Sequence, residues 1–225
     1  MKNPPNIVLI LADDMGYGDI KAFNSESKIA TPQLDKLAAS GMIFTDAHAS
    51  ASSCVPSRYG LLTGRYPFRM KSYKWREEPL IDEGRITIAS VLRKNGYRTG
   101  MVGKWHLGKS PTTIPYAKGF DRSFALMESG ADNYVDQPYS AMYERVHYFE
   151  DEKAVTLPTE NYFSTDYYTD KIIDYIGSNK EDGKPFFAYV SYHAVHYPHQ
   201  ASIEFIDKYN GVYDKGWHEL RKSRI

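Results

Sequence analysis

Short apolar runs and longer amphipathic stretches follow one another along this chain. Residues 6–12 form a continuous, β-branched apolar run, which predicts a strand buried on both faces. Residues 42–47, 99–102 and 185–192 also have the composition of strands. The stretches that separate these runs have the spacing of apolar residues that is typical of helices.

Those stretches also carry helix start and stop signals. Thr31 can cap a helix, Pro32 suits its first position and Gly41 ends it. Further helices are expected at residues 57–62, 86–94 and 167–176. Because strands alternate with helices, the pattern predicts an α/β fold with a mostly parallel sheet flanked by helices.

Residues 108–160 have no clear period and are rich in tyrosine, proline and glycine. They are expected to form a long loop region or a small insertion, of the kind that shapes a binding site. No repeat, low-complexity tract or linker divides the chain. Its 225 residues are therefore expected to belong to one domain with a full core.

Composition and charge narrow the classes of function. Basic and acidic side chains number 28 each, which removes the electrostatic basis for binding nucleic acid or an anionic membrane. A single cysteine excludes an internal disulfide, and no apolar stretch approaches the ~20 residues of a membrane span. The apolar run near the N-terminus is too short for a secretory signal. The protein is expected to be cytoplasmic, or periplasmic or secreted if a leader is removed.

Chemically useful side chains follow three of the predicted strands. Asp13 and Asp14 follow the first, Lys104 and His106 follow the strand at 99–102, and the strand at 185–192 leads to His193 and His196. In an open parallel sheet, ligands bind beyond the carboxyl ends of the strands. The sequence therefore predicts a site at this edge of the sheet.

Each of these groups also has an ordinary structural interpretation. Asp13 and Asp14 would repel each other unless a hard cation binds them, but such a pair can equally cap a helix or lie in a surface loop. Lys104 and His106 would place a cation beside a general acid or base, or could be a solvated lysine and a structural histidine.

Histidines recur every third residue at His193, His196 and His199, which could resemble a zinc cluster. Pro198 argues against a helix that would align their side chains, so a zinc site is the weaker interpretation. The histidines at 48, 147 and 218 have no motif around them and are interpreted as structural or surface residues.

Cys54 is followed by Pro56 and Arg58, which fit a tight turn into a helix N-terminus that favours an anion. A phosphatase-type cysteine loop needs its arginine six positions after the cysteine, where this chain has Gly60, so that class is excluded. A Cys-His protease stays open at this point, but it gives no role to Asp13 and its neighbours.

The run CVPSRYGLLTGR at residues 54–65 resembles the type I sulfatase signature, C-x-P-S-R-x-x-x-L-T-G. NIVLILADDMGYGD, GKWHLG and PFFAYVSYHAVHYPHQ resemble, in order, further segments of the same family. Within the family, the resemblance is closest to bacterial arylsulfatases. It implies an alkaline-phosphatase-like fold and hydrolysis of sulfate esters, whether small molecules or glycans.

The resemblance also assigns a role to each residue. It implies that a maturing enzyme oxidises Cys54 to formylglycine, whose hydrate is both the nucleophile and a ligand of a calcium ion, with magnesium as the alternative. Asp13 and Asp14 would ligate the same ion. Arg58 would hold the hydrate and Lys104 would contact the sulfate. His106 would accept a proton from the hydrate, and His196 would stabilise or protonate the leaving oxygen.

The family pattern continues beyond the segments found here. An Asp-Asn pair that completes the metal site and a second lysine are expected later in the family, and Asp132-Asn133 does not follow a buried strand. The chain is therefore expected to be the N-terminal part of a single catalytic domain. Two alternatives remain at this point: a phosphonate or phosphodiester hydrolase of the same superfamily, and an inactive fragment.

Overall fold

The computed structural model describes residues 4–70, 79–178 and 183–222. The chain divides into two compact units. The first comprises residues 1–13 and 49–198 and contains the sheet, and the second comprises residues 14–48 and 199–225.

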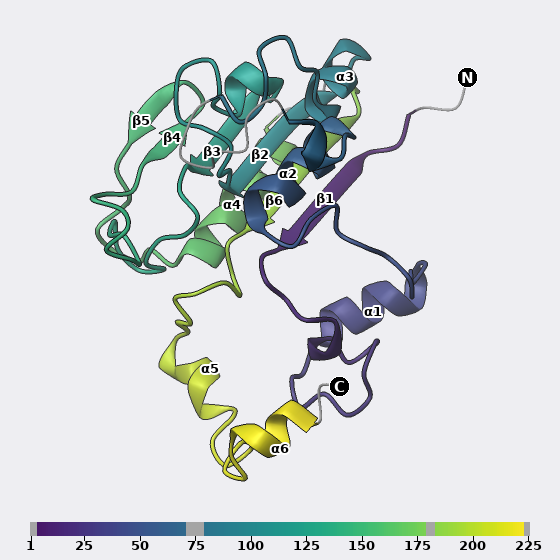
Figure 1. Ribbon diagram of the computed structural model, residues 1–225, viewed down its shortest axis with the longest axis vertical. Helices are drawn as coiled ribbons and strands as arrows, with labels where there is room; N and C mark the ends of the chain where they lie inside the picture. Colours follow the sequence, from purple (N-terminus) through teal and green to yellow (C-terminus); the bar gives the residue numbers. More distant parts are fainter. Residues whose placement is uncertain (1–3, 71–78, 179–182, 223–225) are drawn as a thin grey trace. The chain divides into compact units, whose positions relative to one another are not determined.

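The first unit is built on a six-stranded sheet with the strand order β1-β6-β2-β3-β4-β5 (Figure 1). The four strands from β1 to β3 are mutually parallel, and β4 and β5 continue the sheet in antiparallel pairing. The strand bounds are Ile7–Ala12 (β1), Arg98–Lys104 (β2), Arg122–Leu126 (β3), Tyr148–Glu150 (β4), Lys153–Val155 (β5) and Phe186–Tyr192 (β6). The prediction of a mostly parallel α/β sheet is confirmed.

Helices cover both faces of this sheet. Helix α4 (Ser164–Gly177) packs on β2 and β6, while α2 (Cys54–Thr63) and α3 (Ile88–Lys94) lie on the opposite face (Figure 1). Successive strand residues alternate between the two cores. Tyr189 of β6 packs in the core under α2 and α3, and its neighbour Val190 packs in the core under α4. The unit is therefore a three-layer structure whose strands are apolar on both sides.

The predicted helices agree with the observed ones within three residues at each end. Thr87 caps α3 because its side chain accepts a hydrogen bond from the backbone N–H of Ser90 at 3.1 Å. Helix α2 begins at Cys54, one turn before the predicted segment at 57–62. Two short 3-10 helices, Pro67–Arg69 (η2) and Tyr116–Lys118 (η3), complete the first unit.

Three sequence expectations about strands are wrong. Residues 42–47 form no strand, and their apolar side chains are exposed, Met42 by 77% and Phe44 by 67%. An apolar run becomes a strand only beside a partner, and no described strand pairs with it. Residues 108–160, expected to be loop, contain β3, β4 and β5. Strand β3 reads RSFAL and lacks β-branched residues, so its sequence gave a weak strand signal.

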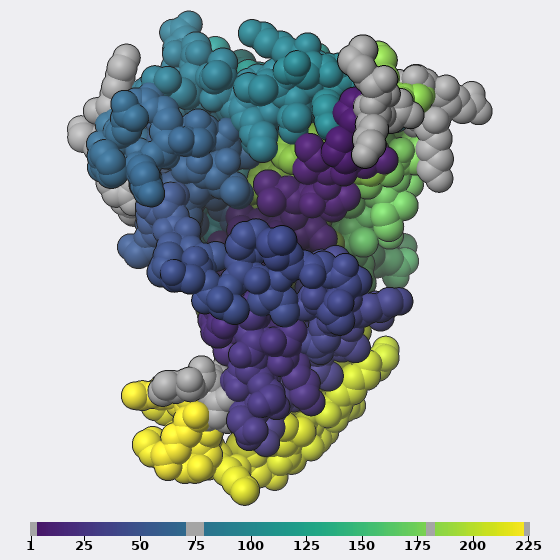
Figure 2. Space-filling view, turned by 90° about the vertical axis from the view of Figure 1, so that its right-hand side faces the viewer, coloured from purple at the N-terminus to yellow at the C-terminus, as the bar shows by residue number. Residues whose placement is uncertain are grey.

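The third error concerns the burial of β1. Val8 and Ile10 are 52% and 56% exposed, so one face of β1 is not covered by described residues. The reason is the edge position of β1: Ile7, Leu9 and Leu11 pack in the core under α2 and α3, while α4, on the other face, packs on β2, β6 and β3. In Figure 2 part of this N-terminal segment, coloured purple, lies at the surface.

The second unit is largely helical. It contains η1 (Tyr17–Asp19), α1 (Pro32–Ser40), α5 (Ile203–Asp207) and α6 (Trp217–Lys222). Helix α1 starts at Pro32 as predicted, and Asp35 in its first turn accepts hydrogen bonds from the Thr31 hydroxyl and the Ala22 amide. None of the helices in the described part of the chain has the length and apolar character needed to cross a membrane.

Candidate functional site

The carboxyl ends of β1 and β2 deliver a buried ion pair. Asp13 follows the last residue of β1, Lys104 is the last residue of β2, and β6 lies between the two strands. The Lys104 Nζ atom is ion-paired with the Asp13 carboxylate, and Lys104 is fully buried. The lysine expected to contact a ligand is therefore held on the acidic group that follows the first strand.

Arg58 of α2 completes this cluster from the helix layer. Its Nη2 atom lies 3.3 Å from the Asp13 carboxylate. Its Nη1 atom donates to the Lys104 carbonyl at 2.9 Å and to the Ser191 hydroxyl at 2.5 Å. Ser191 in turn donates to the same carbonyl at 2.8 Å. Arg58 is only 1% exposed and thus joins α2 to three strands.

The charges of this cluster shift one another. Burial alone would raise the pKa of Asp13, but Lys104 and Arg58 outweigh it and hold that pKa below its usual value. Burial, followed by the charge of Arg58, lowers the pKa of Lys104, although Asp13 and Cys54 act in the opposite direction. The Asp13 carboxylate is therefore ionised at neutral pH, and Lys104 lies near enough to Cys54 for their charges to interact.

Gly103 allows β2 and β6 to approach closely beside Lys104. Its φ is +96°, and a Cβ atom would lie 2.0 Å from the Ser191 carbonyl oxygen. No other amino acid fits both the conformation and the space at this position.

Two buried histidines lie at the same edge of the sheet. Burial, followed by the charges of Lys104 and Arg58, lowers the pKa of His106 to about 3. Burial and the charge of Lys104 lower the pKa of His193 to about 4. Both imidazoles are therefore neutral at neutral pH, and neither ring nitrogen of His193 has a hydrogen-bond partner among the described residues.

His196 is half-buried, and its Nδ1 atom lies 2.6 Å from the Tyr197 carbonyl oxygen. A carbonyl only accepts hydrogen bonds, so Nδ1 carries the hydrogen and Nε2 carries the lone pair when the ring is neutral. Among the described residues, His193, His196 and His199 do not form a group of three side chains that could hold a metal ion.

Cys54, His106 and His196 line one cavity of 310 Å³. Cys54 is half-buried at the first position of α2, where the helix N-terminus favours an anion. The other lining residues are Ser53, Val55, Ser129, Tyr139, Met142 and Tyr143. Arg58, expected to hold the hydrate, and Lys104, expected to contact the sulfate, are not among the residues that line this cavity.

The sequence missed two parts of this site. Ser191 was not singled out, although a lone hydroxyl inside the apolar run PFFAYVSY is a usable signal. Ser129, Tyr139, Met142 and Tyr143 were not named either, but they lie in the tyrosine-rich region expected to shape a binding site.

The described residues fit only part of a calcium site. Asp13 offers carboxylate oxygens, the donors that Ca²⁺ prefers, but calcium takes 6–8 such ligands. Asp14 is exposed with φ +60° and belongs to the second unit, so its role as a ligand stays a prediction. In the described part of the chain, no group of three or more His, Cys, Asp or Glu side chains could hold a metal ion.

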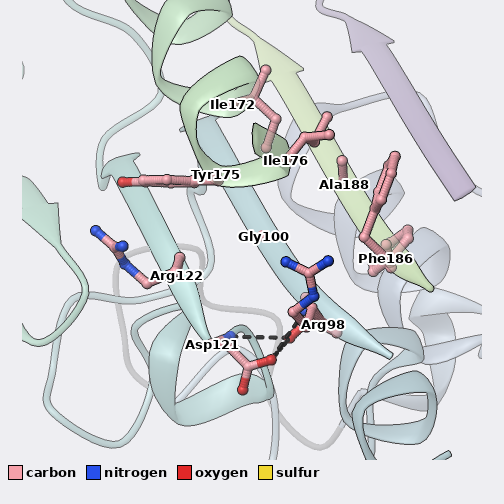
Figure 3. Close-up of a pocket in the computed structure, with 11 residues that line it drawn as sticks. Arg98, Gly100, Asp121, Arg122, Ile172, Tyr175, Ile176, Phe186 and Ala188 are labelled. Atoms are coloured by element: carbon pink, nitrogen blue, oxygen red, sulfur yellow. Dashed lines mark hydrogen bonds between the residues drawn. The ribbon is translucent and has the colours of Figure 1, made fainter. Parts of the chain in front are cut away.

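A second cavity lies at the opposite, amino ends of the strands, under the C-terminal half of α4 (Figure 3). It is lined by the apolar side chains of Ile172, Tyr175 and Phe187 and by Arg98 and Arg122. Its volume is 60 Å³, against 310 Å³ for the cavity at Cys54. A space of this size holds a few water molecules and no substrate.

The geometry defines a class of α/β protein with an acid–base site at the carboxyl edge of a parallel sheet. A protein-family model described as Sulfatase matches residues 5–224, and the chain belongs to this family. The arylsulfatase of Klebsiella aerogenes is 34% identical over 233 residues, which cover 98% of this chain and 49% of that enzyme.

Solved structures agree with this assignment. The structure of Ps i-CgsB in complex with k-i-k-neocarrahexaose has a TM-score of 0.80 and 32% identity, covering 94% of this chain and 49% of that one. A protein of the alkaline phosphatase superfamily from Vibrio parahaemolyticus shares the fold, with a TM-score of 0.57 and 20% identity over 90% of this chain and 43% of that one. The chain thus spans about half the length of the relatives it matches.

Proposed function

We propose that the protein hydrolyses sulfate esters at residue 54. The observation that supports this most strongly is the shared cavity of Cys54, His106 and His196 beside the Asp13–Lys104–Arg58 cluster. A helix N-terminus with cationic side chains beneath it suits an anionic group, and two imidazoles beside it can move protons.

Cys54 is proposed to react as formylglycine rather than as a thiol. A maturing enzyme would convert the CH₂–SH group to an aldehyde: a two-electron oxidant such as molecular oxygen accepts the electrons, water supplies the aldehyde oxygen and the sulfur leaves as hydrogen sulfide. The hydrated aldehyde supplies a hydroxyl nucleophile and a second hydroxyl whose deprotonation breaks the C–O bond to sulfate, so water need not attack sulfur. Residue 54 lies in the first turn of α2, and the helix N-terminus favours the negative charge that develops on the nucleophilic hydroxyl oxygen.

The two cavity histidines are proposed to divide the proton transfers. His106 lines the cavity with Cys54, and its Nδ1 atom has no hydrogen-bond partner among the described residues, so it is proposed to accept a proton from the hydrated aldehyde. His196 has its Nδ1 hydrogen directed to the Tyr197 carbonyl, so its Nε2 atom is the one that would carry a proton to the leaving oxygen. Arg58 and Lys104 supply positive charge beneath the sulfate.

Asp13, Asp14 and residue 54 are proposed to hold a calcium ion, with magnesium as the alternative. When bound, such an ion stabilises negative charge on the transferring group and lowers the pKa of a bound hydroxyl. Asp13 also keeps Lys104 in place through its ion pair, a role that does not depend on the metal.

The proposed substrates are sulfate esters of sugars or phenols. Ps i-CgsB was solved in complex with k-i-k-neocarrahexaose, and the Klebsiella enzyme is named an arylsulfatase, so one similar protein binds a sugar chain and another is named for aryl sulfates. Phosphodiesters are the competing substrate class, and comparing rates on an aryl sulfate and an aryl phosphodiester separates the two activities.

The test begins with the mass of the tryptic peptide 37–58 from protein co-produced with a formylglycine-generating enzyme. We expect the thiol to be replaced by an aldehyde and the protein to release sulfate from an aryl or sugar sulfate. Cys54→Ala should abolish turnover while the melting temperature stays near that of the parent, because this side chain is half-buried in a cavity. An unmodified thiol, or undiminished turnover by Cys54→Ala, would contradict the proposal.

A further inference from the structure

The wall of the Cys54 cavity contains a cluster of hydroxyl groups that the proposed chemistry does not use. Ser129, Tyr139 and Tyr143 all line the cavity. The hydroxyls of Ser129 and Tyr139 are 2.5 Å apart, and the Tyr143 hydroxyl donates to Ser129 at 3.0 Å. We refer to these three side chains as the hydroxyl cluster.

The hydroxyl cluster has one hydrogen more than its internal bonds require. Three hydroxyl groups carry three hydrogens, and two hydrogen bonds join them. If Ser129 donates to Tyr139, the hydrogen of Tyr139 remains. If Tyr139 donates to Ser129, the hydrogen of Ser129 remains. In either arrangement the cluster offers one donor to a molecule in the cavity.

The position of the cluster is fixed by its surroundings. The ring of Tyr139 meets the His196 imidazole edge-on, with centroids 5.6 Å apart and an interplanar angle of 86°. A Cβ atom on Gly130 would lie 3.3 Å from the Tyr139 ring, which is a tight contact. The glycine at this position therefore leaves room for the ring. Tyr139 therefore touches the histidine proposed to carry the leaving-group proton.

The chemistry of the wall indicates what it would bind. Aromatic rings and the apolar side chain of Met142 offer surface to the C–H groups of a sugar ring, and the spare hydroxyl hydrogen requires an oxygen acceptor. None of the described residues that line the cavity is Lys or Arg. A sugar ring that enters here is thus recognised by the hydroxyl groups of the wall. These lining residues offer no lysine or arginine to pair with a second negative charge on the ring.

We propose that the hydroxyl cluster is the leaving-group subsite and selects a hydroxylated, otherwise uncharged sugar ring over a plain aryl group. This inference rests on the proposed sulfate ester hydrolysis. The sugar ring packs against Tyr139 and Tyr143, and a hydroxyl or ring oxygen next to the ester accepts the spare hydrogen. The volume of 310 Å³ lies within the range of about 300–1,000 Å³ typical of small-molecule sites.

The test compares the parent with the double variant Ser129→Ala/Tyr139→Phe, which keeps both tyrosine rings and removes the two hydroxyl groups that can carry the spare hydrogen. Tyr134→Phe serves as the matched control, because Tyr134 is in the same region, is 38% exposed and does not line the cavity. Binding of a panel of monosulfated hexoses is measured by calorimetry, and kcat/KM is measured on the same sugars and on 4-nitrophenyl sulfate.

We expect the double variant to bind and turn over the best sugar sulfate about tenfold less well, mainly through KM, as for the loss of one hydrogen bond. Its kcat/KM on 4-nitrophenyl sulfate should fall by a clearly smaller factor than its kcat/KM on the sugar sulfate, and Tyr134→Phe should change kcat/KM on neither substrate. A second sulfate on the hexose should weaken binding to the parent.

The two proposals can fail separately. In one outcome, the parent binds monosulfated hexoses and the double variant binds them about tenfold less well, but neither protein hydrolyses sugar or aryl sulfates. This result would confirm the subsite and contradict the proposed function. If aryl sulfate is hydrolysed, but no hexose binds or the double variant loses equally on both substrate types, the subsite is wrong and the function stands.

Discussion

Arg58 shows how much of the site depends on buried polar side chains. It contacts the Asp13 carboxylate, the Lys104 carbonyl and the Ser191 hydroxyl while being 1% exposed. A guanidinium buried to this degree is costly unless its donors are used. The site therefore relies on a residue that does not reach the cavity, and on a serine that supports it.

We predict that Ser191→Ala lowers the free energy of unfolding by about 1–3 kcal/mol. The substitution removes an acceptor from the Arg58 Nη1 atom and a donor to the Lys104 carbonyl, all in a buried environment. The measurement is urea unfolding followed by circular dichroism.

Ser123→Ala is the matched control for this experiment. Ser123 is also fully buried in a strand, but its hydroxyl has no hydrogen-bond partner among the described residues. Its loss should change the free energy of unfolding by less than about 0.5 kcal/mol. Equal effects of the two substitutions would show that the Ser191 hydroxyl contributes no more than its volume.

At the scale of elements, the arrangement of strand ends depends on how closely β2 and β6 pair. The backbone at Gly103 passes so near the Ser191 carbonyl that no side chain fits. The adjacent Lys104 is thereby placed against Asp13 across the intervening strand. The separation of these two strands therefore controls the ion pair.

We predict that Gly103→Ala destabilises the protein by more than about 3 kcal/mol, because a left-handed conformation and a backbone clash add together. Gly64→Ala tests the conformational part alone, since Gly64 has φ +65° with nothing within 4 Å of a Cβ atom. It should cost roughly 1–2 kcal/mol. Thermal unfolding of both variants measures the difference, and a Gly103→Ala protein as stable as Gly64→Ala would contradict the close approach.

Helix α4 provides a second test at this scale. Ile172 is 5% exposed and packs against the sheet, while its neighbour Ile173 is 58% exposed. Ile172→Ala should lower the free energy of unfolding by about 3 kcal/mol, and Ile173→Ala by less than about 1 kcal/mol. The same measurement on both variants checks which face of α4 is buried, and a reversed order would refute the packing.

The sequence predicted elements well where a pattern was long and the partners lay in the same unit. Strands β1 and β6 and helix α4 were found from their apolar pattern alone. Residues 42–47 have an equally good strand composition but have no described strand beside them, whereas β3 becomes a strand because β2 lies next to it. Pairing, which depends on the whole fold, decides such short segments.

For the whole molecule, the order of motifs predicted which side chains meet at one edge of the sheet, but not how deeply they lie. Lys104 was expected to contact a ligand and is fully buried against Asp13. Asp14, expected to act with Asp13, is exposed, whereas Asp13 is buried. Burial and cavity shape depend on contacts between distant segments, and the spacing of residues in a motif does not encode them.

The buried histidines make the stability of the first unit depend on pH. His106 and His193 have folded-state pKa values of about 3 and about 4, below the unfolded value of about 6.5. The unfolded chain therefore binds more protons between these pH values. The contribution of the two neutral histidines to the free energy of unfolding is fully present above pH 6.5 and is lost as the pH falls toward 4. The slope is at most about 1.4 kcal/mol per pH unit for each histidine.

We predict that His193→Asn makes the free energy of unfolding depend less on pH between 6.5 and 4.5 than in the parent. His218→Asn, which removes an exposed histidine, serves as the control. The measurement is urea unfolding at several pH values. Identical slopes for the parent and His193→Asn would show that His193 is protonated equally in the folded and unfolded chain.

The parallel pairing of β1 with β6 also sets an order of events during synthesis. Ile7 pairs with Phe187, so the strand that precedes Asp13 finds its partner only when nearly all of this chain has left the ribosome. Cys54 emerges far earlier, and at about 5–20 residues per second the intervening stretch takes on the order of ten seconds to translate. Residue 54 is therefore synthesised well before the strand that completes the pairing of β1.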